Sequence, residues 1–370
     1  MGFPVFKSHE IISLIYRFAV NSYVFFQKHT LKVYALPPTN ALINLTWRCN
    51  CVCYFCNAHF PGKEEITLNE LVQILKQLPK GSAITFAGGE ITLLKDFLPM
   101  MKLAAKHHKV QIITSGSTLN KNKGMLKELI DYGLCGIAFS VDAPNNIHNK
   151  IRGPEGLLQQ VVDAIKDIKE IRKEKKLIKP LIYINTVILK ESIPYLPEMV
   201  DLSVDLGIDS LSFGMLEFKN YDENDLIRFR EKFSTAIENA KKGKLPLSFW
   251  LGVDTAYNIA KKFPESLKTG IPVDKIKMSN FKCYAPWSTV MIDPDGMTHI
   301  CRDGISNGMA SAHSDGMKKY NASLGTLGNI KKTPLKELWN NQIAQNWRKT
   351  IIELKELPPT CLSCCSCRSK

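Results

Sequence analysis

Three cysteines stand close together near the start of the chain, at Cys49, Cys53 and Cys56. They directly follow an apolar, strand-like run at residues 41–46. Thiolates this close in sequence can converge on one metal centre, and iron–sulfur clusters are the usual occupants of such sites. Four ligands would complete a 4Fe–4S cluster, so three leave one iron open for a substrate or a cofactor. The residues alone also allow a zinc knuckle.

A second motif, Gly88-Gly89-Glu90, follows the next strand-like run. Paired glycines let a ligand come close to the backbone, because they carry no side chain. The carboxylate of Glu90 has the charge to meet an ammonium group. By itself the motif is also an ordinary strand-to-helix turn, so its meaning depends on the cysteine motif one strand earlier.

The two motifs together resemble the radical S-adenosylmethionine (SAM) family. The resemblance implies that Cys49, Cys53 and Cys56 hold a 4Fe–4S cluster whose open iron chelates the amino and carboxylate groups of SAM. It also implies that an electron from the cluster cleaves the sulfonium and releases a 5′-deoxyadenosyl radical. A Gly-Gly-Glu segment at this place in the family contacts the methionine end of SAM, which assigns that contact to residues 88–90.

The resemblance extends to polar residues on the predicted fourth and fifth strands. Ser140 is expected to hydrogen-bond the ribose or the carboxylate of SAM, and Arg152 to pair with its carboxylate, which suits the bidentate guanidinium. Asp142 either supports these contacts or caps the next turn. Asn185 either reaches the adenosine or is a structural polar residue inside the barrel.

A second group of cysteines lies toward the C-terminus. Cys283 and Cys301 flank a predicted hairpin, and a C-x2-C pair follows at Cys361 and Cys364. Four thiolates brought together in this way can hold a closed 4Fe–4S cluster or a tetrahedral zinc ion. Cys367 is an alternative to Cys364 as the fourth ligand.

Residues 282–367 resemble the auxiliary-cluster domains called SPASM and twitch. A full SPASM domain holds two clusters and needs a longer series of cysteines after the C-x2-C pair. This chain offers only Cys365 and Cys367 there, so we expect a twitch-like module with one auxiliary 4Fe–4S cluster, with zinc as the alternative occupant. Cys51 and Cys365 are expected not to be ligands.

Strand-like and helix-like segments alternate through the first two thirds of the chain. Such alternation predicts parallel βαβ units with right-handed crossovers. The radical SAM resemblance likewise implies an α/β fold with a partial, TIM-like (β/α)6 barrel, whose chemistry lies at the C-terminal ends of the strands. The predicted strands are residues 41–46, 83–87, 110–114, 136–140, 181–189 and 210–214, and the predicted helices are residues 68–78, 97–107, 121–132, 157–175 and 195–206.

Four regions are expected along the chain. Residues 1–40 form an amphipathic segment, which either packs on the barrel or lies at a membrane interface. Residues 41–245 form the barrel, and residues 246–281 form a linker or helical connection. Residues 282–370 form a small cysteine-rich module with a hairpin, whose turn is at residues 293–296, and a helix at residues 335–354.

Composition narrows the class of protein. The chain has 370 residues and 11 cysteines, a usage that in a reducing compartment indicates metal ligation. It has no long apolar span and no cleavable signal, so we expect a cytoplasmic protein, with membrane contact through residues 1–36 as the second interpretation. The net charge of +14 favours an acidic substrate or an acidic electron donor of the flavodoxin or ferredoxin type. A nucleic-acid-binding module is not expected, because no such motif accompanies the charge.

The function that these observations predict is that of a radical SAM oxidoreductase. Abstraction of a hydrogen atom from an unactivated C–H bond, with an auxiliary cluster to accept an electron, would give a net oxidation or a new bond on a small-molecule, lipid-linked or peptide substrate. The alternative from another class is a non-enzymatic iron–sulfur electron carrier or redox sensor. The sequence assigns no general acid or base.

Overall fold

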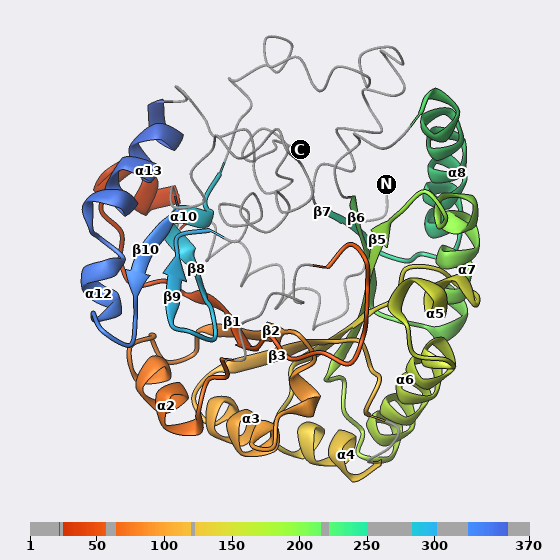
Figure 1. Ribbon diagram of the computed structural model, residues 1–370, viewed down its shortest axis with the longest axis horizontal. Helices are drawn as coiled ribbons and strands as arrows, with labels where there is room; N and C mark the ends of the chain where they lie inside the picture. The colour runs from red at the N-terminus through yellow and green to blue at the C-terminus, as the bar shows by residue number, and fades with distance from the viewer. Residues whose placement is uncertain are drawn as a thin grey trace, which may run out of the picture.

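The computed structural model describes residues 22, 25–56, 64–119, 123–215, 222–250, 283–301 and 325–353. In these residues one curved sheet of 10 strands runs in the order β10-β9-β8-β1-β2-β3-β4-β5-β6-β7. Figure 1 shows the sheet bent into an open barrel, with helices α2, α3, α4, α6, α7 and α8 along its outer side. The strands are β1 Asn40–Thr46, β2 Ala83–Gly88, β3 Lys109–Thr114, β4 Gly136–Ser140, β5 Leu181–Ile188, β6 Ser210–Met215, β7 Leu247–Trp250, β8 Thr289–Ile292, β9 Met297–His299 and β10 Thr326–Asn329.

The helices alternate with the strands as the sequence predicts. On α2, Thr67 and Glu70 form a reciprocal capping box that fixes the start of the helix. The same helix buries Leu71, Ile74 and Leu75, which recur at helical spacing and face the sheet. The α-helices are α2 Leu68–Lys76, α3 Phe97–Ala105, α4 Lys123–Asp131, α5 Ile147–Arg152, α6 Leu157–Glu174, α7 Leu196–Leu206, α8 Glu223–Lys242, α10 Ala285–Ser288, α12 Leu335–Leu338 and α13 Gln342–Glu353. The shorter turns are the π-helix η1 Gln27–Leu31 and the 3₁₀ helices η3 Ile91–Leu93 and η4 Ile193–Tyr195.

The two faces of the sheet differ in polarity. On β4, Ile137 and Phe139 are fully buried, whereas the alternate residue Ser140 is partly exposed. Because side chains alternate across a strand, the apolar set packs against the helices and Ser140 lies on the inner face of the barrel. Ser140 pairs with Asn185 on β5, and Asn185 pairs with Ser212 on β6. A row of polar residues therefore crosses the inner face.

The predicted α/β fold with its partial barrel is confirmed, and the sheet extends beyond the prediction at both edges. Strand β7, Leu247–Trp250, pairs in parallel with β6 and lies in the segment predicted as a connection. Strand β8 pairs in parallel with β1, so the C-terminal hairpin continues the barrel sheet. Edge strands carry unpaired backbone groups, and β8 satisfies those of β1. Residues 251–282 lie outside the described residues.

The predicted helix at residues 335–354 is divided into α12 and α13. The division falls at Trp339–Asn341, where Oδ1 of Asn341 accepts a hydrogen bond from the backbone N–H of Ala344 at 3.0 Å. Asparagine competes with helix continuation by making such local bonds, which is why it favours caps. The sequence pattern of apolar residues continues through the break and does not reveal it.

The segment before β1 lies on the C-terminal module. The indole N–H of Trp287 donates to the carbonyl of Lys32 at 2.7 Å, and that of Trp339 donates to the carbonyl of Leu36 at 2.8 Å. Arg348 is fully buried beneath the segment and donates to the carbonyl of Val33 at 3.0 Å. The described part of the N-terminal region is therefore packed, although Phe25 and Phe26 in its preceding helical turn stay exposed. Among the described residues, no helix is long and apolar enough to cross a membrane.

Candidate functional site at the cysteine loop

The cysteine loop, residues 49–56, begins three residues after the C-terminal end of β1. Cys51 and Cys53 are buried, and they pack with the half-buried Cys49, Cys56 and Phe55 in one small cluster. Backbone bonds hold the loop: the N–H of residue 56 donates to the carbonyl of residue 53 at 3.0 Å, and the N–H of residue 52 to that of residue 152 at 2.8 Å. The predicted thiol ligands are therefore together at the end of the first strand.

Cys51 belongs to this group of thiols, which sequence reasoning did not expect. Its backbone N–H donates to the sulfur of Cys49 at 3.4 Å. Interaction with the neighbouring thiols lowers the pKa of Cys51 and raises the pKa of Cys49 and of Cys53. Cys51 is buried on the same side of the loop as Cys53, and the intervening Val52 is exposed. The spacing of two residues between Cys51 and Cys53 could have indicated this shared side.

The thiol set has the donor chemistry of an iron–sulfur cluster. A cluster places a separate iron at each thiolate, so its ligands do not need to meet at one atom. A guanidinium nitrogen of Arg152 lies 3.9 Å from the sulfur of Cys53, and a nearby cation favours the thiolate that ligates iron. The donor chemistry fits the predicted cluster.

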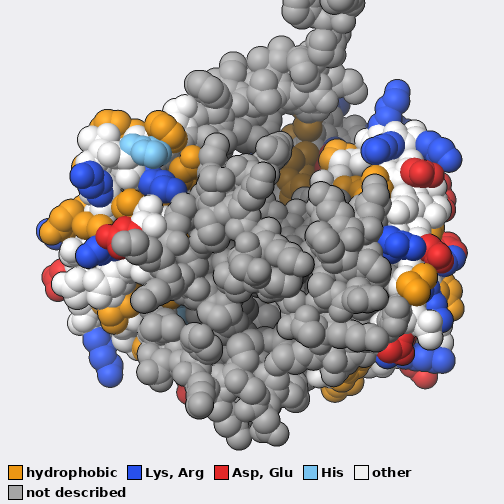
Figure 2. All heavy atoms as spheres, turned by 90° about the horizontal axis from the view of Figure 1, so that it is seen from above, with side chains coloured by type: hydrophobic (Ala, Val, Ile, Leu, Met, Phe, Trp, Pro, Cys, Tyr) orange, Lys and Arg blue, Asp and Glu red, His pale blue; other side chains and the backbone are white. Residues whose placement is uncertain are grey.

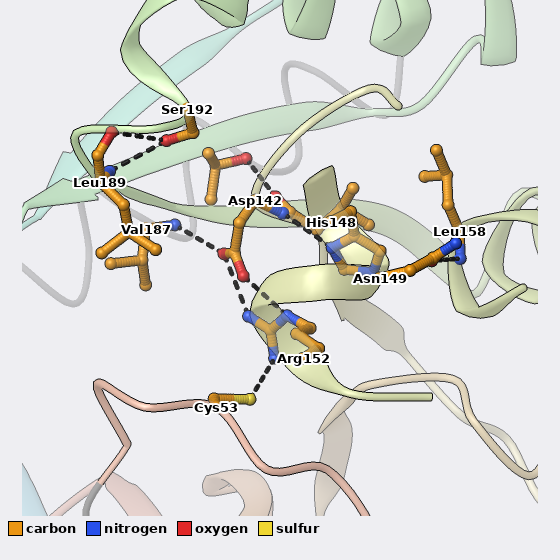
Figure 3. Close-up of polar contacts among 11 residues, drawn as sticks. Cys53, Asp142, His148, Asn149, Arg152, Leu158, Val187, Leu189 and Ser192 are labelled. Carbon is orange, nitrogen blue, oxygen red and sulfur yellow. Dashed lines mark hydrogen bonds and ion pairs between the residues drawn. The ribbon is translucent and has the colours of Figure 1, made fainter. Parts of the chain in front are cut away.

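Arg152 and Asp142 form a buried, bidentate ion pair beside the loop (Figure 3). Nε of Arg152 donates to Oδ2 of Asp142 at 2.8 Å, and Nη2 donates to Oδ1 at 3.0 Å. The N–H of Val187 on β5 donates to the same carboxylate at 3.1 Å. Although burial opposes it, the Asp142 carboxylate raises the pKa of Arg152. Arg152, predicted to pair with the SAM carboxylate, thus already has an acidic partner and lies between Asp142 and Cys53.

His148 is a fully buried member of the same group. Its Nδ1 accepts a hydrogen bond from the backbone N–H of Asp142 at 3.2 Å (Figure 3). Burial lowers the pKa of His148 to about 4, and the nearby Arg152 guanidinium adds to the effect. The neutral ring therefore orients the start of the β4–α5 loop, a role that the sequence analysis did not assign.

The chain's own backbone packs against both glycines of the Gly-Gly-Glu motif and leaves no room for a side chain. A Cβ on Gly88 would lie 2.3 Å from the carbonyl oxygen of Thr46, and a Cβ on Gly89 would lie 2.2 Å from that of Arg48. The backbone N–H of Gly89 donates to the carbonyl of Thr46 at 2.7 Å, and that of Glu90 to the carbonyl of Arg48 at 2.8 Å. The motif therefore fixes the backbone that leads from β1 into the cysteine loop.

Glu90 is fully buried and heavily hydrogen-bonded. Its Oε1 accepts from the hydroxyls of Thr92 at 2.5 Å and Thr114 at 2.7 Å. Its Oε2 accepts from the N–H of Ser115 at 2.7 Å and from its hydroxyl at 2.5 Å. The carboxylate ties the end of β2 to the end of β3, and each of its oxygens already has donors inside the protein.

The remaining predicted residues are divided between the barrel and the C-terminal module. Ser140, at the end of β4, and Asn185, midway along β5, are register partners on the inner face. Cys283 is buried and Cys301 is half-buried, and both belong to the module that β8 joins to the barrel. The other predicted ligands and the alternative one lie outside the described residues: Cys361, Cys364 and Cys367.

Comparison with known proteins gives two matches to families. Residues 43–202 match the Radical SAM superfamily. Residues 283–367 match the SPASM family, described as an iron–sulfur cluster-binding domain. The first match contains the cysteine loop and the Gly-Gly-Glu motif, and the second begins at Cys283 and ends at Cys367.

The first two curated relatives each match about half of the chain. The tungsten-containing aldehyde ferredoxin oxidoreductase cofactor-modifying protein of Pyrococcus furiosus is 28% identical over 192 residues, which are 50% of this chain and 54% of that protein. The PqqA peptide cyclase of Bradyrhizobium diazoefficiens is 25% identical over 201 residues, 52% of this chain and 50% of that protein. The chain thus spans about half the length of these relatives.

Solved structures share the fold over almost the whole chain. SuiB of Streptococcus suis, bound to the precursor peptide SuiA, superposes with a TM-score of 0.61 at 18% identity and covers 98% of this chain and 76% of its own. A structure of anSMEcpe with bound AdoMet gives a TM-score of 0.55 at 18% identity, covering 88% of each chain. At this level of identity the likeness concerns the architecture of the barrel and the C-terminal module.

Proposed function

The chain belongs to the radical SAM enzymes that carry a SPASM-type iron–sulfur domain, and from this premise we propose that it modifies a peptide by removing a hydrogen atom from an unactivated C–H bond. The observation that carries the proposal is the buried thiol group of residues 49–56 at the C-terminal end of β1. When bound there, a 4Fe–4S cluster and SAM supply a 5′-deoxyadenosyl radical, an oxidant strong enough for such bonds.

The residues of the loop hold and shield the site. Cys49, Cys53 and Cys56 are the proposed ligands, and the Arg152 guanidinium, 3.9 Å from the sulfur of Cys53, stabilises the thiolate form. Arg152 also stacks over the ring of Phe55, with its guanidinium carbon 5.8 Å from the ring centroid. Aromatic and guanidinium groups together cover one side of the loop and limit the access of water.

The contacts to SAM are assigned by which polar groups the protein leaves available. The carboxylate of Glu90 and the guanidinium of Arg152 already have partners inside the protein. We therefore assign to them the positioning of the loop. The family resemblance assigns the methionine end of SAM to the segment at Gly88 and Gly89, although the N–H of Gly89 already donates to Thr46. Ser140 and Asn185, paired on the inner face, are the proposed contacts of the adenosine.

The C-terminal module is proposed to hold one auxiliary 4Fe–4S cluster. Its ligands would be Cys283, Cys301, Cys361 and Cys364, with Cys367 as the alternative to Cys364. Held by these cysteines, a closed cluster would supply an electron acceptor for a net oxidation or a new bond on the substrate. Structural zinc would leave the module without this role.

A peptide is the proposed substrate because the relatives favour it. Two curated relatives are named as a PqqA peptide cyclase and a sporulation killing factor maturation protein, and SuiB was solved with a precursor peptide. A lipid-linked substrate is the second candidate, and one observation favours it: Phe25 and Phe26 are each 52% exposed, and Lys32, a few residues later, is exposed as well. Aromatic and basic groups together bind anionic membrane surfaces. Vesicle binding by the chain that is lost in Phe25→Ser/Phe26→Ser would support this second candidate.

The test is anaerobic reconstitution with iron and sulfide, followed by addition of dithionite and SAM. About eight irons per chain and formation of 5′-deoxyadenosine are expected from two 4Fe–4S clusters. The variants Cys49→Ala, Cys53→Ala and Cys56→Ala should each abolish 5′-deoxyadenosine, while Cys135→Ala, a half-buried cysteine outside the loop, should not. Iron binding without SAM cleavage in the wild-type chain would contradict the proposal and favour an electron carrier.

A further inference from the structure

A buried chain of polar contacts joins strand β1 to the C-terminal hairpin. Nδ2 of Asn44 on β1 donates to Oδ1 of Asp293 in the hairpin turn at 2.9 Å. Nε2 of His299 on β9 bonds to Oδ2 of Asp293 at 3.0 Å, and Nδ1 of His299 bonds to the hydroxyl of Thr326 on β10 at 2.9 Å. The side chains of His299 and Asp293 are 7% and 13% exposed, and Asn44 is also buried.

The donors and acceptors of this network match. A carboxylate only accepts, so Nε2 of His299 carries the hydrogen that Asp293 receives. Nδ1 bonds to the hydroxyl of Thr326, which can either donate or accept. Every polar atom of the ring therefore has a partner, and the ring has no free nitrogen for a substrate.

The network lies between the two elements that carry the cysteines. Asn44 is two residues from the end of β1 at Thr46, and Cys49 follows three residues later. His299 ends β9, two residues before Cys301. The strands are also paired directly, because β1 and β8 are neighbours in parallel register.

We propose that Asp293 and His299 are positioning residues that hold Cys301, and with it the auxiliary cluster site, at a fixed place relative to the cysteine loop. The proposal rests on the proposed function, because it takes Cys301 as a cluster ligand. Electron transfer between a substrate at the barrel and an auxiliary cluster needs a fixed separation. The network supplies a directional contact, whereas apolar packing alone tolerates sliding.

The buried polar residues of this network contribute little net stability, so we look for another role for them. Burying a carboxylate, an imidazole and an amide costs desolvation energy that hydrogen bonds only offset. The two modules have a second contact that avoids this cost, since Lys331 pairs with Glu70 of α2 at 2.9 Å with both side chains partly exposed. Lys331→Ala is therefore a matched control: it breaks a contact between the same two modules but leaves the buried network intact.

Two variants of His299 separate hydrogen bonding from volume. His299→Leu fills similar space but removes both side-chain hydrogen bonds. His299→Gln restores both, because its amide nitrogen can donate to Asp293 and its amide oxygen can accept from Thr326. Rescue by glutamine is a result that packing alone would not produce.

The first measurement uses the reduced, metal-free chain, so it does not depend on any cofactor. Hydrogen exchange is followed at the backbone N–H of Ile300, the buried neighbour of Cys301, which donates to the carbonyl of Gly325 at 3.0 Å. His299→Leu should exchange about tenfold faster than the wild type, because a local opening that costs about 1.4 kcal/mol less exposes a group tenfold more often. His299→Gln and Lys331→Ala should stay within about twofold of the wild type. Equal rates in His299→Leu and the wild type would overturn the proposal, as would an equal rise in Lys331→Ala.

The second measurement uses the reconstituted chain. In His299→Leu the electron paramagnetic resonance signal and the midpoint potential of the auxiliary cluster should shift, while 5′-deoxyadenosine forms at the wild-type rate. Loss of the auxiliary iron in His299→Leu but not in His299→Gln also supports the proposal; loss in both overturns it. A wild-type chain without a second cluster contradicts the proposed function of the module, and the hydrogen-exchange rates alone then decide on the network.

Discussion

Replacing Arg152 with methionine removes the cation from a buried pair and leaves its partner behind. The Asp142 side chain is fully buried and that of Arg152 is 9% exposed. After the change, Asp142 keeps one donor among those described, the N–H of Val187 at 3.1 Å. Breaking one partner of a buried ion pair costs about 3–5 kcal/mol, because an uncompensated charge stays in a medium of low dielectric. We expect a loss of this size in the free energy of unfolding.

The assay is urea unfolding of the reduced, metal-free chain at pH 7, which excludes any contribution of a cluster. Arg172→Met is the matched control, since Arg172 pairs with Asp209 at 3.3 Å in a more exposed place, and it should cost about 1 kcal/mol or less. In the double variant Asp142→Asn/Arg152→Met the buried charge is gone, so most of the loss should be recovered. The reasoning is refuted if Arg152→Met costs no more than Arg172→Met, or if the double variant is as unstable as the single one.

Three further predictions concern the loop and the edges of the barrel. Gly89→Ala places a Cβ 2.2 Å from the Arg48 carbonyl oxygen and should abolish iron loading at the cysteine loop, as measured by iron content. In Gly81→Ala the Cβ meets nothing within 4 Å, and only the backbone strain of φ +81° remains, about 1 kcal/mol, so this variant should load iron normally. Cys51→Ala should keep about four irons at the loop if three thiolates suffice for the cluster, and a loss of that iron would make Cys51 a ligand. Burial alone would raise the pKa of Glu70, but hydrogen bonding to the backbone N–H of Thr67 and the nearby Lys331 lower it. The ionised Glu70 therefore stabilises the folded chain above the unfolded pKa of the carboxyl group. This stabilisation is lost as the pH falls through the lower folded pKa. Glu70→Gln should cost about 1 kcal/mol at pH 7 and remove this acid-dependent loss, as urea unfolding between pH 7 and pH 3 would show.

The alternation of strands and helices is the part of the fold that the sequence predicts well. All six predicted strands are present within a residue of their predicted bounds, because runs such as residues 110–114 and 136–140 are buried on the helix side and read as apolar segments. The extra strand β7 was not found, since its four residues, Leu247–Trp250, follow the lysine-rich end of α8 and lack a helix pattern after them. Pairing of β8 with β1 joins residues about 250 positions apart, and no local pattern encodes such a contact.

The site was predictable in residue type but less so in contacts. Cysteine spacing located the thiol group, and the position of the Gly-Gly-Glu motif after β2 was read correctly. The sequence suggests that the two glycines make room for a ligand. In the structure they also make room for the backbone of Thr46 and Arg48, which a side chain at either position would hit. Charged side chains were likewise assigned to SAM because the sequence does not show which buried groups they meet: Arg152 pairs with Asp142 ten residues earlier, and Glu90 accepts from Ser115 after β3. Single-sequence reasoning identifies a charge but not the counterion that folding gives it.

These contacts change the meaning of strand β1. In a barrel that ended at residue 245, β1 would be an exposed edge, and the loop that follows it would have support from β2 alone. In the structure β1 has β2 on one side and β8 on the other, with registers from Asn40 to Thr46 and from Asn40 to Ile43. The strand that leads to the cysteine loop is thus an interior strand, and its rigidity depends on the C-terminal module. An interior strand opens less often than an edge strand. The module therefore stabilises the first cluster site through backbone pairing, independently of any auxiliary cluster that it holds.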